Sequence, residues 1–482
     1  MTIDPRSPVL VGSGQYLHRA TGLDDALDPA SLMCRAIEQA AADAGLSGVP
    51  SVDSVRVIGL LSWRYGNAAQ IVAEQLGIDA REYAYSTMGG NSPQSLVNGT
   101  AKEIQAGELD LAILTGGESW RTRMRARKAG VELQWPKAPA DSIPRLLGEE
   151  LVMNHPSEIA QEIVQPVQVY PMFETAIRAR AGHGVEEHQV AISELWAGFS
   201  EVAAQNPNAW IREQKSAEQI RTVSPDNRMI GYPYPKYMNS NNDVDMGAAL
   251  IMCSVEKARS LGIPEDRWVY VHSGADCHEH QFISNRWSFD ETPAIALGGR
   301  RALELAGIGI DDVGLVDLYS CFPAAVQLGA QSLGLTLPTE GGDRPLTRTG
   351  GLPFAGGPWN NYVMHAIATI TSELREQPGA NGLVWGNGGY TTKHAFGVYS
   401  TTPPAAGFRH AYPQDEIDQM PRRELAEVAD AAGTATIEAY TVMHSRDGVP
   451  ETAIASCLLP DGRRAWGTVS YTHLTLPTKR IV

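Results

Sequence analysis

The sequence has few cysteines and no long apolar run. Five cysteines are scattered among 482 residues without paired spacing, which argues against a disulfide framework and favours a reducing compartment. No uninterrupted apolar stretch approaches the roughly 18 residues that a membrane-spanning helix needs. The first residues, Met1 to Arg6, lack the basic and apolar regions of a secretory signal. We therefore expect a cytoplasmic protein with no membrane span.

Positive charge is also scarce. The chain carries 39 lysines and arginines against 55 acidic residues, a formal net charge of -16. Such a surface repels phosphate, so a general nucleic-acid binder is not expected. The apolar fraction of 43% and the charged fraction of 20% are ordinary for a soluble globular protein. The length allows two or three domains, each with a buried core.

Strand-like and helix-like segments alternate along the chain, which predicts a layered α/β fold. Two successive rounds each place a proline-started helix directly after a buried strand, at Pro93 and Pro323. This repetition indicates two similar halves. The strand-like segments are 9–12, 55–61, 82–86, 268–272 and 313–318, and the helix-like segments are 30–44, 68–76, 93–106, 294–306 and 323–333.

Several apolar runs stop at turns made of small residues, as strands do where they enter tight corners. In the C-terminal half, 316–323 reads Val-Asp-Leu-Tyr-Ser-Cys-Phe-Pro, 350–361 reads Gly-Gly-Leu-Pro-Phe-Ala-Gly-Gly-Pro-Trp-Asn-Asn, and 384–390 reads Val-Trp-Gly-Asn-Gly-Gly-Tyr. In the N-terminal half, 87–93 reads Thr-Met-Gly-Gly-Asn-Ser-Pro, and 111–119 reads Leu-Ala-Ile-Leu-Thr-Gly-Gly-Glu-Ser.

The order and spacing of these blocks resemble the active-site loops of the thiolase superfamily over roughly residues 8 to 405. The resemblance is closest to the sterol-carrier-protein-type thiolases, and within them to the mycobacterial-type thiolase-like protein type 1 group, which carries an added C-terminal domain. It implies a five-layer α-β-α-β-α fold in two pseudo-repeated halves, with a small C-terminal antiparallel β-barrel. It also implies a relative of the acetyl-CoA C-acetyltransferases of lipid metabolism.

Three catalytic side chains of that family are missing. Where the family keeps its nucleophilic cysteine, the histidine of Gly-His-Pro and the second cysteine of Cys-x-Gly-Gly, this sequence has Gly90, Gly357 and Gly386. The resemblance therefore implies that ordinary thiolysis and Claisen condensation are absent. One hypothesis is an acyl-CoA-dependent enzyme with altered chemistry. The other is a non-catalytic acyl-CoA or steroid-CoA binding protein, or a partner subunit of a separate thiolase.

Three side chains of the motif loops are candidates for a different chemistry. Cys321 lies near a helix start that could lower the pKa of its thiol, although a buried structural cysteine explains it as well. Tyr319 can donate a hydrogen bond but is a poor base near neutral pH. His394, like His365, is either a base or a structural histidine.

Another set of residues is expected to bind the substrate. Ser92 is a good helix N-cap, and the glycines before it let a ligand approach the free amides of the helix start. Asparagines in the glycine-rich turns either donate hydrogen bonds to an oxyanion or only form the turns. Arginines in the basic cluster 121–128 either hold the phosphates of CoA or form a solvated helix face. These candidates are Gly89, Asn91, Ser92, Asn360, Asn361, Asn387, Gly388, Arg123 and Arg125.

No metal or bound cofactor is expected besides CoA or acyl-CoA as ligand. The run 277–280, Cys-His-Glu-His, suggests metal ligands, but neighbouring residues on a strand point to opposite faces. At most two of its side chains converge, and no second cluster has zinc-type spacing.

The domain boundaries follow from changes in composition. The N-terminal half takes 1–119 and 238–265, a loop-domain excursion takes 120–237, and the C-terminal half takes 266–405. Alternating segments and Asp-Gly turns in 406–470 indicate the added β domain. Residues 471–482 read like vector sequence, so we expect a truncated barrel with an exposed edge. A monomer is favoured over a homodimer, with a lipid-metabolism enzyme as an alternative partner.

Overall fold

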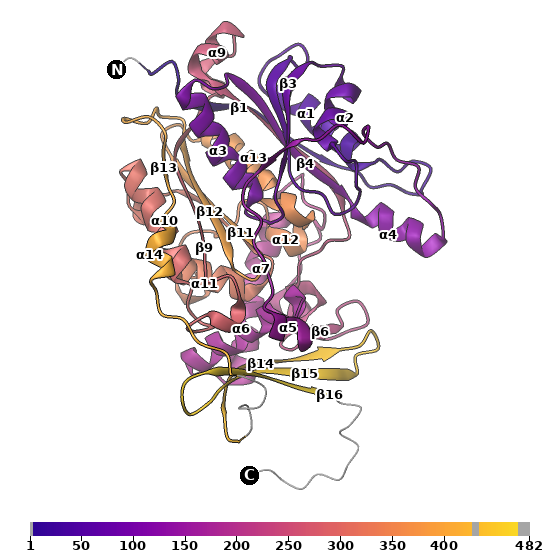
Figure 1. Cartoon of the computed structure of the whole chain (residues 1–482), viewed down its shortest axis with the longest axis vertical. Coiled ribbons are helices and arrows are strands. Elements are labelled where there is room, and N and C mark those ends of the chain that lie inside the picture. The colour runs from indigo at the N-terminus through magenta and orange to yellow at the C-terminus, as the bar shows by residue number, and fades with distance from the viewer. Residues whose placement is uncertain (1–2, 427–432, 471–482) are drawn as a thin grey trace.

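The computed structural model describes residues 3–426 and 433–470 and folds them into five alternating layers (Figure 1). Strands β3, β2, β4, β8 and β1 form the sheet of the N-terminal half, and β9, β12, β11 and β10 that of the C-terminal half. The two sheets join where β1 pairs with β9. Their bounds are β1 Pro8–Leu17, β2 Val52–Val57, β3 Ala80–Ser86, β4 Leu111–Ser119, β8 Asp245–Ser254, β9 Val269–His278, β10 Leu315–Leu318, β11 Asn381–Gly388 and β12 Lys393–Ser400.

Helices fill the space between and outside the two sheets. The central layer is α3 (Ser92–Ala106) with α13 (Tyr362–Glu376), and both contact strands of both halves. Helices α1 (Pro29–Asp43) and α2 (Ala68–Leu76) cover the outer face of the first sheet, and α10 (Pro293–Ala306) and α11 (Pro323–Leu333) that of the second. The predicted five-layer fold is confirmed. Smaller elements are α9 Val255–Ser260, α12 Gly351–Phe354, β13 Arg409–Ala411 and α14 Gln414–Asp418.

Local sequence explains most of these elements. All ten residues of β8 are buried, as expected for an apolar strand covered on both faces. Helix α3 ends at Gly107, whose φ of 78° suits glycine. The prediction that Ser92 is the N-cap of α3 is wrong. Asn91 precedes the helix with φ -74° and ψ -22°, so Ser92 is already helical, and its hydroxyl donates instead to the Thr87 carbonyl.

The segment between the halves is mainly helical and closes one edge of the sheet. Its strand β5 (Arg145–Leu147) pairs in parallel with β3, so the backbone of β3 is not left open at the sheet edge. The other elements are α4 Trp120–Ala129, α5 Pro156–Ala160, α6 Pro166–Ala181, α7 Val185–Gln205, α8 Ala217–Arg221, β6 Met229–Gly231 and β7 Tyr234–Pro235. Within the described ranges, no helix is long and apolar enough to cross a membrane.

The C-terminal segment forms an open antiparallel sheet at the end of the molecule away from α1 and α2 (Figure 1). It consists of β14 (Thr436–His444), β15 (Pro450–Leu458) and β16 (Arg464–Ser470), and it continues through β6 and β7. The predicted closed barrel is not found in the described residues, because β16 and β7 are at opposite ends of the series. The expected vector-like tail, 471–482, lies outside the described residues.

The C-terminal sheet packs against the rest of the chain, as predicted for short hairpins that cannot stabilise themselves. The fully buried Arg464 donates hydrogen bonds to the carbonyls of Ile283, Ser284 and Arg286 and pairs with Glu438. On the other side, the Thr175 hydroxyl of α6 donates to the Tyr440 carbonyl at 2.9 Å.

Candidate functional site

The structure brings the loops after β3, β10 and β11 together at the N-terminus of α3. The Gly89 amide donates to Asn360 Oδ1 at 3.1 Å, and Asn360 Nδ2 donates to the Gly59 carbonyl at 2.8 Å. Asn361 Nδ2 donates to the Gly116 carbonyl at 2.7 Å. These amides therefore link their own loop to the turn before α3, to the loop after β2 and to strand β4.

The loops meet so closely at Gly90 that no side chain fits there. A Cβ built on Gly90 would lie 2.5 Å from the Asn387 carbonyl oxygen and 2.7 Å from Cζ of Tyr319, and closer still to the Tyr319 hydroxyl. Real Cβ atoms essentially never approach within 3.0 Å of another group. A Cβ at Gly386 would lie 3.1 Å from Cα of Asn91. The space of a nucleophile is therefore occupied by a buried tyrosine and by backbone.

Gly357, the glycine at the position of the family's histidine, has different neighbours. A Cβ at Gly357 would lie 2.9 Å from Asn242 Oδ1 and 3.4 Å from the Asn241 carbonyl oxygen. The Gly357 amide donates to that same carbonyl at 2.9 Å. Gly357 thus packs against the chain that leads into β8, where the end of the Asn242 side chain lies in the space of a Cβ.

Tyr170 of α6 is a site residue that the sequence did not reveal. Its hydroxyl donates to the Gly389 carbonyl at 3.0 Å and accepts from Asn387 Nδ2 at 2.9 Å and from the Thr391 amide at 3.0 Å. Its ring stacks on Phe322 with centroids 4.5 Å apart. Tyr170 therefore fixes the loop after β11 from the segment that crosses over the site. No motif surrounds this tyrosine, so no local signal marks it.

Cys321 and Tyr319, the two catalytic candidates near Gly90, are buried and stay protonated. Burial raises the pKa of Cys321 to about 12, partly opposed by its hydrogen bond with Tyr170. A thiol with that pKa is not a thiolate near neutral pH and is a poor nucleophile. Burial also raises the pKa of Tyr319 well above its ordinary value. Cys321 thus fits the structural alternative.

The two candidate histidines are also buried and neutral. Burial lowers the pKa of His365 to about 3, and its Nδ1 lies 2.9 Å from Gln15 Oε1. Burial lowers the pKa of His394 well below its ordinary value, and the Trp385 indole donates to its Nδ1 at 3.3 Å. A histidine with so low a pKa is a weak base, so neither supplies ordinary general-base catalysis near neutral pH.

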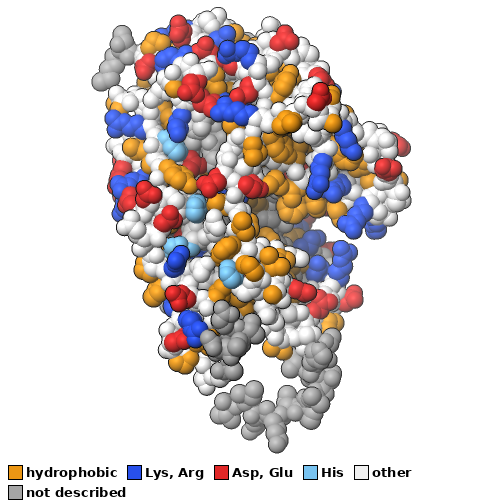
Figure 2. All heavy atoms as spheres, viewed as in Figure 1, with side chains coloured by type: hydrophobic (Ala, Val, Ile, Leu, Met, Phe, Trp, Pro, Cys, Tyr) orange, Lys and Arg blue, Asp and Glu red, His pale blue; other side chains and the backbone are white. Residues whose placement is uncertain are grey.

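The basic cluster lies on α4, at the side of the molecule where Lys and Arg side chains gather in Figure 2. Arg123, Arg127 and Lys128 are exposed, and Arg123 also donates to the Leu61 carbonyl. The prediction places Arg125 among the ligand-binding groups, but its guanidinium donates to the carbonyls of Ala20 and Thr21 at 2.8 and 2.9 Å. Its charge therefore serves an internal contact, which sequence alone does not distinguish from an exposed one.

The run 277–280 lies at the end of β9. Cys277 Sγ donates to the Ala294 carbonyl at 3.3 Å, and Glu279 Oε1 accepts from the Ala294 amide at 2.9 Å. Both side chains thus pack against the start of α10. In the described part of the chain, no three His, Cys, Asp or Glu residues converge as metal ligands.

Known proteins are similar to this chain, and a family profile matches its C-terminal segment. The family profile of the thiolase-like protein type 1 additional C-terminal domain matches residues 413–472. The chain is 24% identical over 218 residues to an acetyl-CoA acetyltransferase of Methanothermobacter thermautotrophicus, covering 41% of this chain and 55% of that protein. It is 26% identical over 190 residues to the benzoylsuccinyl-CoA thiolase subunit BbsB of Thauera aromatica, covering 36% and 46%. The chain thus spans about half the length of these two relatives.

One solved structure is similar over almost the whole length. It is a monomeric SCP2-thiolase like protein type 1 from Mycobacterium smegmatis, with a TM-score of 0.81 and 35% sequence identity. The match covers 97% of this chain and 92% of that one. The five layers, the loops around Gly90 and the added C-terminal sheet therefore have one explanation: this chain belongs to the SCP2-thiolase-like protein type 1 family.

Proposed function

We propose that this protein binds CoA or an acyl-CoA without catalysing thiolysis or Claisen condensation. The observation that carries the proposal is the filled space at Gly90, where the Tyr319 hydroxyl lies in place of a nucleophilic side chain. The thiolase reaction needs a thiolate to carry the acyl group and a base to generate it. Gly90, Gly357 and Gly386 supply neither, and the raised pKa of the Cys321 thiol argues against a substitute.

The basic face of α4 supports binding of CoA. Its exposed Arg123, Arg127 and Lys128 form a concentrated positive patch on an acidic protein. Charge-assisted hydrogen bonds to phosphate are the stronger class of such bonds, and guanidinium groups bind phosphate in bidentate geometry. The name of the Methanothermobacter relative, an acetyl-CoA acetyltransferase, points to the same class of ligand.

Calorimetry with CoA at low ionic strength tests the binding. We expect saturable heat that weakens as salt is added, because exposed charges are screened. Replacing Arg123→Glu together with Arg127→Glu should weaken binding by about tenfold or more. Arg446→Glu, at an exposed hairpin turn of the C-terminal sheet, is the matched control and should change nothing. Absence of any heat in the unmodified protein would refute the proposal, and unchanged affinity of the double variant would refute the role of α4.

A direct assay tests the loss of catalysis. The purified protein should show no cleavage of acetoacetyl-CoA in the presence of free CoA, and no condensation of acetyl-CoA. Robust thiolysis that disappears in Cys321→Ala would show that a different cysteine carries the acyl group.

A partner subunit of a separate thiolase is the second candidate. The Thauera aromatica relative is named as a subunit, which favours this alternative. A protein that binds no CoA but restores activity to an inactive partner enzyme would establish it. We also propose that the chain itself is a monomer, because β5 covers the edge strand β3; light scattering showing a concentration-independent dimer would contradict this.

A further inference from the structure

A cavity of about 340 Å³ lies beside α3. Its wall consists of one face of α3, the ends of β3 and β9, the start of β12 and the segment that follows β5. The volume is within the range of small-molecule sites. Polar residues form most of the lining, among them Asp276, Lys393 and Tyr412, and Leu96, Leu147 and Leu151 form an apolar part of it.

Lys393 is buried in this wall without a counter-ion. Its residue is 8% exposed, and its ammonium group donates to the Met88 carbonyl. Among the described residues, no carboxylate lies within ion-pair distance of it. Burial lowers the pKa of Lys393, and the charge of Glu150 opposes this only partly. Burying an ammonium group is costly unless a counter-ion pairs with it. The described residues provide no such counter-ion for Lys393.

The other charged groups of the cavity are already satisfied or exposed. Asp276 accepts hydrogen bonds from Ser95, Asn98 and His410, so it does not neutralise the lysine. At the rim, the exposed Lys102 and Glu149 have opposite charges.

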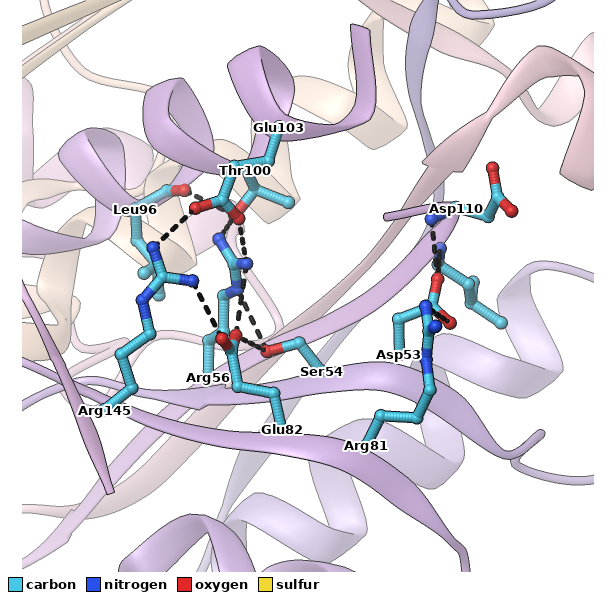
Figure 3. Close-up of polar contacts among 11 residues, drawn as sticks. Asp53, Ser54, Arg56, Arg81, Glu82, Leu96, Thr100, Glu103, Asp110 and Arg145 are labelled. Atoms are coloured by element: carbon cyan, nitrogen blue, oxygen red, sulfur yellow. Dashed lines mark hydrogen bonds and ion pairs between the residues drawn. The ribbon is translucent and has the colours of Figure 1, made fainter. Parts of the chain in front are cut away.

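Arg56 is paired as well. It is 1% exposed and forms ion pairs with Glu82 and Glu103, and Arg145 of β5 joins the same two carboxylates at 2.8 and 3.0 Å (Figure 3). This network fixes β5, and with it Leu147, over the cavity. Lys393 is therefore the buried charge here that is left for a ligand.

The buried polar atoms Nε2 of His394 and Oδ1 of Asn91 have almost no surface open to the cavity, so neither is a ligand group. The cavity thus offers the Lys393 ammonium group beside the apolar side chains of three leucines. A phosphate dianion would need more positive charge than this, whereas a carboxylate needs one cation and tolerates an apolar body.

We propose that this cavity binds a small aliphatic carboxylic acid, with its carboxylate on Nζ of Lys393 and its carbon chain against Leu96, Leu147 and Leu151. The site is separate from the proposed CoA site on α4, so either can fail without the other.

Calorimetry with acetate, butyrate and hexanoate, and with the neutral hexanamide, tests the proposal. We expect hexanoate to bind with a Kd of about 1 mM or tighter, and hexanamide to bind about tenfold more weakly or not at all. Lys393→Met should abolish hexanoate binding. Lys236→Met, an exposed lysine away from the cavity, is the matched control.

A second variant blocks the cavity without touching the lysine. Gly99 lies on the cavity face of α3, and a Cβ there meets no atom within 4 Å, so Gly99→Leu should fold normally and fill the space. Loss of hexanoate binding in Gly99→Leu, with CoA binding retained, supports the proposal. It is overturned if no acid binds, if hexanamide binds as well as hexanoate, or if folded Lys393→Met or Gly99→Leu keeps the affinity of the unmodified protein.

Discussion

A side chain added at Gly90 should destabilise the protein, whereas the same change at Gly99 should stabilise it. At Gly90, a Cβ meets the Asn387 carbonyl at 2.5 Å and the buried ring of Tyr319 at 2.7 Å, and neither is the flexible end of a side chain. Overpacking of this kind costs typically about 1–3 kcal/mol. At Gly99, inside α3, a Cβ meets nothing, and glycine to alanine at a compatible position gains about 0.4–1 kcal/mol.

The two alanine variants should therefore differ by about 1.4–4 kcal/mol in the free energy of unfolding. Urea denaturation followed by circular dichroism measures the difference. Gly90→Cys should behave like Gly90→Ala and gain no thiolase activity. A double-mutant cycle with Tyr319→Ala locates the cause. The double variant should lose less free energy of unfolding than the sum of the two single losses, by about 1 kcal/mol or more. Equal stability of Gly90→Ala and Gly99→Ala, or strict additivity with Tyr319→Ala, would refute the filled-space reasoning.

Two further variants test buried charges. Burial raises the pKa of Glu118 to about 7 from an ordinary 4.5, so the folded protein keeps a proton that the unfolded chain releases; this stabilisation is complete below pH 4.5 and is lost as the pH rises through 7. In urea denaturation, the free energy of unfolding of the unmodified protein should decline by about 3 kcal/mol between pH 4.5 and 7 because of this group. Glu118→Gln should remove that decline, and an unchanged pH slope in the variant would contradict the prediction. Arg464→Met should cost about 3 kcal/mol or more because it leaves Glu438 and three carbonyls without their partner. Limited proteolysis should cut the C-terminal sheet faster in Arg464→Met than in the control Arg463→Met. Equally slow cleavage of the two variants would count against the role of Arg464 in holding the sheet.

Local signals were enough to predict the alternating strands and helices, and the family resemblance gave the five layers, but neither gave the contents of the site. Apolar runs that stop at turns of small residues gave β4, β10 and β11, because burial and turn geometry depend on a few adjacent residues. The choice between Asn91 and Ser92 as N-cap needed the backbone angles of Asn91, which packing sets. Glycine at position 90 indicated a missing nucleophile, but the tyrosine in its place comes from a distant loop.

Long-range contacts account for the other differences. Tyr170 reaches the loop after β11 across 217 or more positions of sequence, and no periodicity or motif encodes such a contact. Exposure separates Arg123 from Arg125, two residues that look alike in the sequence. Closure of a barrel depends on how the end strands pair, so the alternating segments in 406–470 predicted a β domain but not the shape of its sheet.

The pairing of β14 with β6 makes the added C-terminal segment and the helical segment over the site a single cooperative unit. The Tyr232 amide donates to the Val442 carbonyl at 2.8 Å, and the Tyr440 amide donates to the Thr175 hydroxyl at 3.0 Å. These amides exchange with solvent only when the two segments separate, so their hydrogen-exchange protection should rise and fall together. Opening of the C-terminal sheet would thereby loosen α6, the helix that carries Tyr170, and a boundary drawn at position 405 cuts through one folding unit.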